Sequence, residues 1–94
     1  MSVMVRYTVK PDEQEGNLER VRAVFAELAD VRPPDFQYSC FTLEDGVSFV
    51  HVASGDFELG SLASFRAFLD GHEARREGPT ERAALREVGS YASS

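Results

Sequence analysis

The sequence predicts an α+β fold, a ferredoxin-like split βαβ sandwich with the element order βαββαβ. Its antiparallel sheet of four strands is expected to carry two helices on one face. Apolar residues alternate in the strand segments, and two helical segments each carry one apolar stripe. The stripe at positions 18, 21, 25 and 28 recurs at 62, 65, 69 and 72. This repeat indicates two βαβ halves, and the length of 94 residues predicts one domain over residues 1–94.

The first strand and helix are predicted from a change of period near Pro11. β-Branched and aromatic residues alternate with other residues before it, at Val3, Val5, Tyr7 and Val9. Asp12 with Glu15 fits a capping box for the following helix, and Asn17 is a rival cap. Pro33-Pro34 is expected to end that helix.

The middle of the chain is predicted to be a hairpin of two strands, residues 36–43 and 47–54. Asp45-Gly46 between them is typical of a two-residue type I′ turn, which needs positive φ at both central residues. That turn would pair Thr42 with Phe49 and Cys40 with His51.

The two faces of the hairpin differ in character. One face would hold Phe41, Leu43, Val50 and Val52, which suit the face of the sheet that the helices cover. The other would hold Tyr38, Cys40, Thr42, Phe49 and His51. Because this second set is too apolar for a free surface, it is expected on the uncovered face, in a dimer interface or a semi-polar cavity.

The second half is predicted to contain a helix and a last strand. Ser61 is a plausible N-cap, and Leu62, Phe65, Leu69 and His72 form the helical stripe. Gly78-Pro79 stops the helix, and residues 80–85 could form one more short turn. The last strand is expected over residues 85–92, around Val88 and Tyr91.

Composition excludes several classes of partner. A net charge of −6 and a pI near 4.8 disfavour nucleic acid. No apolar run approaches the roughly 20 residues of a membrane span, and residues 1–10 do not read as a signal peptide. The single Cys40 fits a reducing cytoplasm. No metal-ligand spacing occurs, so neither a metal nor another cofactor is expected.

Five polar residues are candidates for a site, each with a structural alternative. His51 could act as a base near neutral pH, or be an interface histidine. Tyr38 could bond a substrate oxygen, and His72 could roof a pocket; each could also be a packing residue. Arg6 would be a carboxylate or phenolate clamp if it points inward, and a surface charge otherwise. Cys40 opposite His51 could be a nucleophile, although an inert thiol is the commoner case.

The sequence also resembles a known family. Residues 5–11, the hairpin 40–52, the set Leu62, Phe65 and Phe68, and residues 88–91 are similar to the dimeric α+β barrel superfamily, the antibiotic biosynthesis monooxygenase-like proteins. The resemblance implies a homodimer through the open sheet faces and a pocket between sheet and helices. It also implies a cofactor-independent monooxygenase, or a related small enzyme, for an aromatic or polyketide-like compound. Haem degradation is the least expected branch because the chain has no Trp.

From their chemistry and predicted positions, His51 is the candidate catalytic residue, and Arg6, Tyr38, Phe49 and His72 are candidate substrate-binding residues. A second class is a non-catalytic ligand-binding or regulatory module. Residues 16–21 loosely resemble the start of the first helix in ACT domains. Residues 46–52 faintly resemble an RRM strand, but the acidic charge disfavours RNA.

Overall fold

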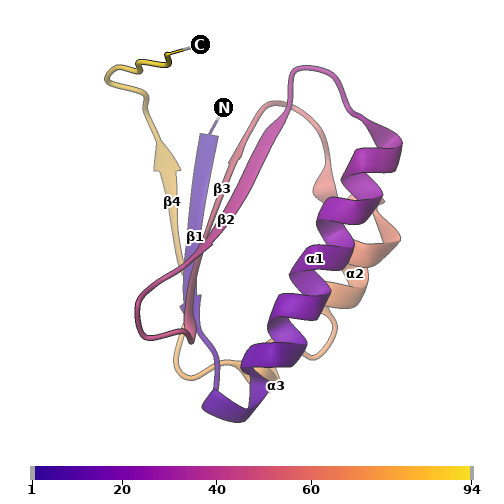
Figure 1. The fold of residues 1–94 in the computed structure, drawn as a ribbon, viewed down its shortest axis with the longest axis vertical. Coiled ribbons are helices and arrows are strands. Elements are labelled where there is room, and N and C mark those ends of the chain that lie inside the picture. The colour runs from indigo at the N-terminus through magenta and orange to yellow at the C-terminus, as the bar shows by residue number, and fades with distance from the viewer. Residues whose placement is uncertain (1, 94) are drawn as a thin grey trace.

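A computed structural model describes residues 2–93 and shows one antiparallel sheet with the helices packed on a single face (Figure 1). The strands are β1 (Ser2–Thr8), β2 (Gln37–Thr42), β3 (Ser48–Ser54) and β4 (Glu81–Leu85), in the spatial order β2-β3-β1-β4. The helices are α1 (Gln14–Val31), α2 (Ala63–Leu69) and α3 (His72–Arg75), with 3-10 turns at η1 (Pro11–Glu13) and η2 (Leu59–Ser61). The predicted fold class is confirmed.

The hairpin has the predicted register but not the predicted turn. Cys40 pairs with His51, and Thr42 pairs with Phe49. Within the turn only Gly46 has positive φ, at 75°, so the expected type I′ turn is wrong. The carboxylate of Asp45 instead accepts hydrogen bonds from the backbone N–H groups of Val47 and Ser48, at 3.0 and 2.8 Å. An aspartate that bonds its own backbone in this way stabilises a longer turn.

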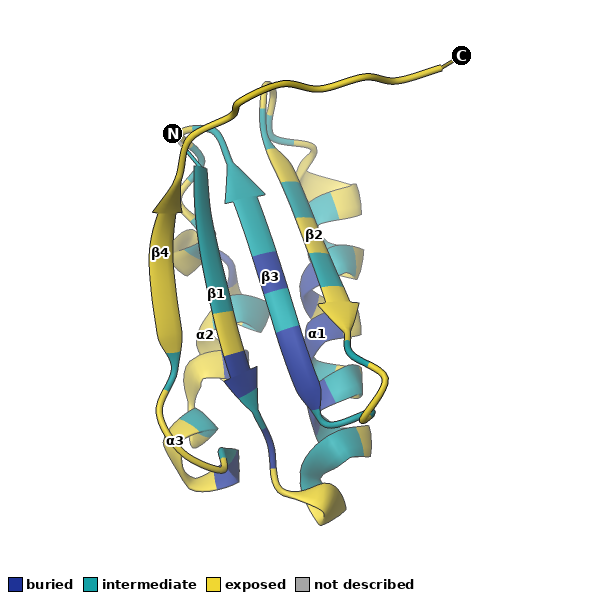
Figure 2. Cartoon of the chain, turned by 90° about the vertical axis from the view of Figure 1, so that its left-hand side faces the viewer, coloured by how far each residue is buried: buried dark blue, intermediate teal, exposed yellow. Residues whose placement is uncertain are grey.

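The two faces of the hairpin are exchanged relative to the prediction. Phe49 is 0% exposed and His51 is 6% exposed, both beneath the helices, whereas Phe41 is 57% exposed. Tyr38 and Cys40 also pack against the core on this inner face. Figure 2 shows the opposite, uncovered face of the sheet, with the helices behind it. Alternation in a sequence defines two faces but does not state which one is covered, so the face assignment was wrong.

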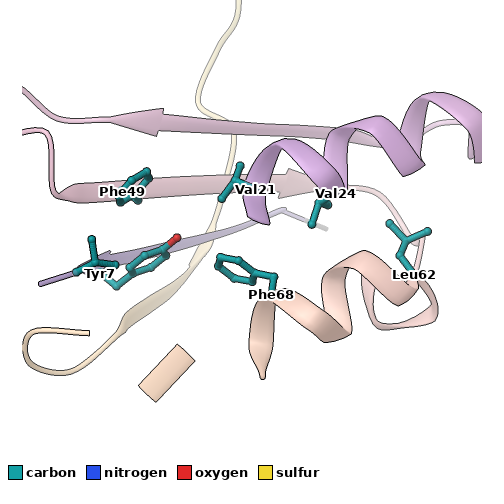
Figure 3. Packing of buried hydrophobic residues seen from close by; sticks show 7 residues of the cluster. Tyr7, Val21, Val24, Phe49, Leu62 and Phe68 are labelled. Atoms are coloured by element: carbon teal, nitrogen blue, oxygen red, sulfur yellow. The ribbon is translucent and has the colours of Figure 1, made fainter. Parts of the chain in front are cut away.

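The core lies between the sheet and the first two helices (Figure 3). Its buried members are Tyr7, Val9, Val21, Val24, Phe49, Leu62 and Phe68. Asn17 lies fully buried within α1, so its expected role as a cap is wrong. The predicted Asp12–Glu15 box is wrong as well, because neither η1 nor α1 has a side-chain cap hydrogen bond.

The second helix is shorter than its stripe predicted. It begins after Leu62 rather than at a Ser61 cap, and Glu27 of α1 binds its first turn through Ser64 N and Ser64 Oγ, at 2.9 and 2.6 Å. These bonds lower the pKa of the Glu27 carboxyl group. Gly71, with a φ of 73°, separates α2 from α3. His72 therefore belongs to a separate short helix.

The last strand lies earlier than predicted. β4 pairs with β1 from Ser2 opposite Leu85 to Arg6 opposite Glu81. Val88 and Tyr91, the expected centre of the strand, are 100% and 91% exposed in an extended tail. Pairing with β1 decides where this strand forms, and intrinsic strand propensity does not. Among the described residues, no helix is long and apolar enough to cross a membrane.

We predict that Gly55→Ala lowers the free energy of unfolding by about 2–4 kcal/mol. Gly55 has a φ of 119°, and an added Cβ would lie 2.5 Å from the carbonyl oxygen of Asp35 and 3.1 Å from Cα of Phe36. Gly60→Ala is the matched control, because its Cβ would meet no atom within 4 Å. Urea denaturation of both variants measures the difference. Equal stability of the two variants would contradict the close approach at Gly55.

Candidate functional site

A cavity of about 610 Å³ lies between the inner face of the sheet and the helices. Its walls come from all four strands, the segment 55–60, α2 and α3. The lining is rich in aromatic and aliphatic side chains, among them Val3, Val5, Tyr7, Phe36, Tyr38, Phe57, Leu59, Phe65, Phe68 and Leu69. Cavities of this size and character are typical of small-molecule sites, where a few polar groups fix the orientation of the ligand.

The principal polar group of the cavity is His51, held between two tyrosine hydroxyl groups. Nε2 of His51 lies 2.8 Å from the hydroxyl oxygen of Tyr7, and Nδ1 lies 2.6 Å from that of Tyr38. Both ring nitrogens therefore have hydrogen-bond partners inside the protein. A ligand in the cavity would reach the imidazole through a tyrosine.

Two further side chains extend this network away from the cavity. Asn17 Nδ2 donates to the hydroxyl of Tyr7 at 3.0 Å, and Cys40 Sγ lies 3.5 Å from His51 Nε2. α1 carries Asn17, β1 carries Tyr7, and the hairpin carries the other three residues. The register pairs Val5 with His51 and Tyr7 with Phe49, so both rings lie on the covered face. The network thus ties the first helix to three strands.

Burial keeps this network uncharged at neutral pH. Removal from water lowers the pKa of His51 from 6.5 to about 4 and raises the pKa values of Tyr7 and Tyr38 above their usual value. Burial also raises the pKa of the Cys40 thiol to about 11. A protonated thiol beside a neutral imidazole is a poor nucleophile, which favours the inert reading of Cys40.

His72 forms part of the cavity wall next to Tyr7. The two rings meet edge to face, with centroids 4.6 Å apart and an interplanar angle of 90°. Burial, followed by the nearby charges of Arg76 and Arg75, lowers the pKa of His72 to about 4. Within the described part of the chain, its buried Nδ1 has no hydrogen-bond partner. Among residues 2–93, no group of three or more His, Cys, Asp and Glu is placed to hold a metal ion.

The structure brings three of the five predicted site residues to the cavity. His51, Tyr38 and His72 line it. Phe49 lies in the core beneath, where its ring stacks on Tyr7 at 5.6 Å. Arg6 is exposed on the opposite face of the sheet, so the expectation of an inward-pointing clamp is wrong. Odd-numbered residues of β1 face the helices, and Arg6 has the other parity.

Sequence reasoning missed Tyr7, Asn17 and Arg82. Tyr7 shares the parity of Val3 and Val5, so its place on an apolar face was a usable signal. Asn17 has helical spacing with Val21 and Val24, the buried residues of α1, so this spacing was a usable signal for its burial. Arg82 lines the cavity from β4, a strand predicted at the wrong place.

Comparison with known proteins identifies the fold. No family model matches the sequence, and no curated protein matches it. Solved structures do match: an antibiotic biosynthesis monooxygenase, with a TM-score of 0.72 and 14% identity, covers 94% of this chain and 98% of its own. A conserved protein from Methanosarcina mazei has a TM-score of 0.71 and 12% identity, covering 92% of this chain and 90% of its own.

A third similar structure is a variant of SnoaB, described as a cofactor-independent oxygenase from Streptomyces nogalater. Its TM-score is 0.58 at 21% identity, over 95% of this chain and 93% of its own. The predicted resemblance to antibiotic biosynthesis monooxygenase-like proteins is confirmed for the fold. Identities this low establish the fold alone.

We predict that stability falls as the pH drops from about 6.5 towards 4. An unfolded histidine titrates near 6.5, whereas folded His51 titrates near 4, so the unfolded chain binds more protons in this window. The contribution of His51 is fully present above about pH 6.5, and about 2 kcal/mol of it is lost by pH 5. The lowered pKa of His72 makes stability fall in the same pH window. The carboxylates of Glu27 and Asp45, whose pKa values are also lowered, lose their stabilising charge only at still lower pH.

Urea denaturation at about pH 7.5 and pH 5 measures this loss. His51→Gln has no imidazole at this position and should lose less stability than the wild type between the two values. An equal loss in both proteins, or an NMR titration of His51 near 6.5, would contradict the prediction.

Proposed function

We propose that the protein binds a small aromatic or polyketide-like molecule in the cavity and oxidises it with O₂ as a cofactor-independent monooxygenase. The observation that carries the proposal is the aromatic-lined cavity of about 610 Å³ with the uncharged Tyr38–His51–Tyr7 group in its wall. Aromatic walls suit a planar ligand, and the tyrosine hydroxyl suits an oxygen on that ligand. The fold shared with a cofactor-independent oxygenase supports the same reading.

The chemistry would require little of the protein. An acidic C–H or O–H group of the substrate loses a proton to water, and the resulting enolate or phenolate gives one electron to O₂. The radical pair combines to a hydroperoxide, and loss of water leaves a carbonyl group, so that CH₂ and O₂ become C=O and H₂O. The protein would orient the substrate, stabilise the anion and exclude water.

The cavity residues have distinct parts in this proposal. Tyr38 would bond the substrate oxygen, and His51 would act on the substrate through Tyr38, by donating from Nδ1 to the tyrosine hydroxyl oxygen, rather than directly. Arg82, which lines the cavity from β4, would attract an anionic substituent in the place once expected for Arg6. His72 and Phe68 lie with ring centroids 5.0 Å apart and would hold the ring system of the substrate.

We further propose that the protein is a homodimer formed through the uncovered faces of two sheets. Met4, Phe41, Val50, Val52 and Leu85 lie on this face and are half-buried or exposed in the single chain. A second copy would cover these apolar side chains, which a sheet with helices on one face leaves in water. The single cysteine fits a cytoplasmic location.

Oxygen uptake with electron-rich hydroxyaromatics and anthrones tests the enzyme. We expect Tyr38→Phe to lower kcat/KM by at least about tenfold, because the hydrogen bond to the developing oxyanion is lost. Tyr91→Phe is the matched control, since Tyr91 is 91% exposed in the tail. Tight binding without O₂ consumption would contradict the proposed enzyme and would favour the alternative, a non-catalytic ACT-like ligand-binding module.

Sedimentation tests the dimer. The wild type should sediment at twice 10.4 kDa at micromolar concentration. Phe41→Glu should sediment as a monomer, because it places a charge on an exposed apolar residue within the proposed interface. Ala26→Glu adds the same charge on the exposed side of α1 and should leave the dimer intact. A monomeric wild type would remove the proposal.

A further inference from the structure

The hydrogen-bond chain at the cavity has a direction that is set at its buried end. Asn17 is 0% exposed on α1, and its amide nitrogen donates to the hydroxyl oxygen of Tyr7 at 3.0 Å. An amide NH₂ group can only donate. The oxygen of Tyr7 therefore acts as the acceptor, and its single proton has to go elsewhere.

Among the described residues, the partner for that proton is Nε2 of His51, 2.8 Å away. Nε2 must then carry a lone pair and no proton. A neutral imidazole has one N–H group, which leaves the proton on Nδ1. Nδ1 donates to the hydroxyl oxygen of Tyr38 at 2.6 Å. The hydroxyl proton of Tyr38, which lines the cavity, is free for a ligand.

We propose that Asn17 is a positioning residue that fixes the Nδ1–H tautomer of His51, so that Tyr38 offers a hydrogen-bond donor to the cavity. The ligand must then carry an acceptor, a carbonyl or an anionic oxygen, against Tyr38. The tautomer follows from the network alone, whereas the ligand class rests on the proposed function. If the hydrogen-bond chain ran in the reverse direction, the hydroxyl oxygen of Tyr38 would accept a hydrogen bond from the ligand, and the site would select a ligand with a hydroxyl group.

The surroundings of His51 agree with this assignment. Its hydrogen-bond partners among the described residues, Tyr7, Tyr38 and Cys40, and the ring of Phe68 at 5.6 Å are uncharged. Cys40 Sγ, 3.5 Å from Nε2, is the more distant neighbour of this nitrogen, so the hydroxyl of Tyr7 at 2.8 Å is its main partner. The neighbouring His72 is itself neutral at pH 7. A run of aligned donors in a buried site strengthens each hydrogen bond and makes the last one a better donor.

Nitrogen-15 NMR of His51 in the ligand-free protein tests the tautomer. The wild type should show protonated Nδ1 and unprotonated Nε2. Asn17→Asp, once its carboxyl group has ionised at higher pH, accepts from Tyr7 and should move the proton to Nε2. Cys40→Ala removes the other neighbour of Nε2 and should leave the tautomer unchanged. A wild type with the proton on Nε2 would overturn the proposal without any variant.

A matched pair of probes tests the ligand class. 1-Tetralone has a carbonyl acceptor that tetralin lacks, and the wild type should bind the ketone about tenfold more tightly, as one good hydrogen bond provides. Tyr38→Phe and ionised Asn17→Asp should both lose this preference. Equal affinity of the wild type for the two probes would overturn the acceptor class. If neither probe binds although the tautomer is as expected, the binding function fails and the role of Asn17 stands.

Discussion

The stacked pair of Tyr7 and Phe49 fixes which side of the sheet the helices cover. The two residues face each other across β1 and β3, with centroids 5.6 Å apart and planes 14° from parallel. Phe49 is fully buried and Phe68 of α2 packs against Tyr7. With this pair on the inner face, alternation also turns Val5 and His51 inward and Arg6 outward. The position of every cavity residue on the strands follows from that choice.

The cavity combines an apolar enclosure with a small number of buried polar atoms. A buried polar group costs about 1–3 kcal/mol if it lacks a partner. His51 avoids this cost because both nitrogens have partners, whereas Asn17 Oδ1 and His72 Nδ1 have none among the described residues. These two unpartnered atoms therefore cost some stability. This balance is common where a site is built for a ligand rather than for the fold.

Much of the architecture could be predicted from the sequence, because period, turn residues and the repeated stripe are local signals. The register of Cys40 opposite His51 came out correctly even though the turn type did not, since both turns join the strands in the same pairing. The covered face, the break at Gly71 and the place of β4 depend on contacts between distant segments. Asn17 reaches Tyr7 across the fold, so no pattern within its own helix reveals the network.

The cavity wall that β4 forms differs from the other walls. All five of its residues are exposed, it pairs with β1 alone among the described strands, and none of the seven core residues belongs to it. Local opening there would break one ladder and leave the core packed. Substitutions at Arg82 can consequently alter what the cavity admits with little effect on folding. The fold thus separates a strand that contributes a wall of the cavity from the residues that form the core.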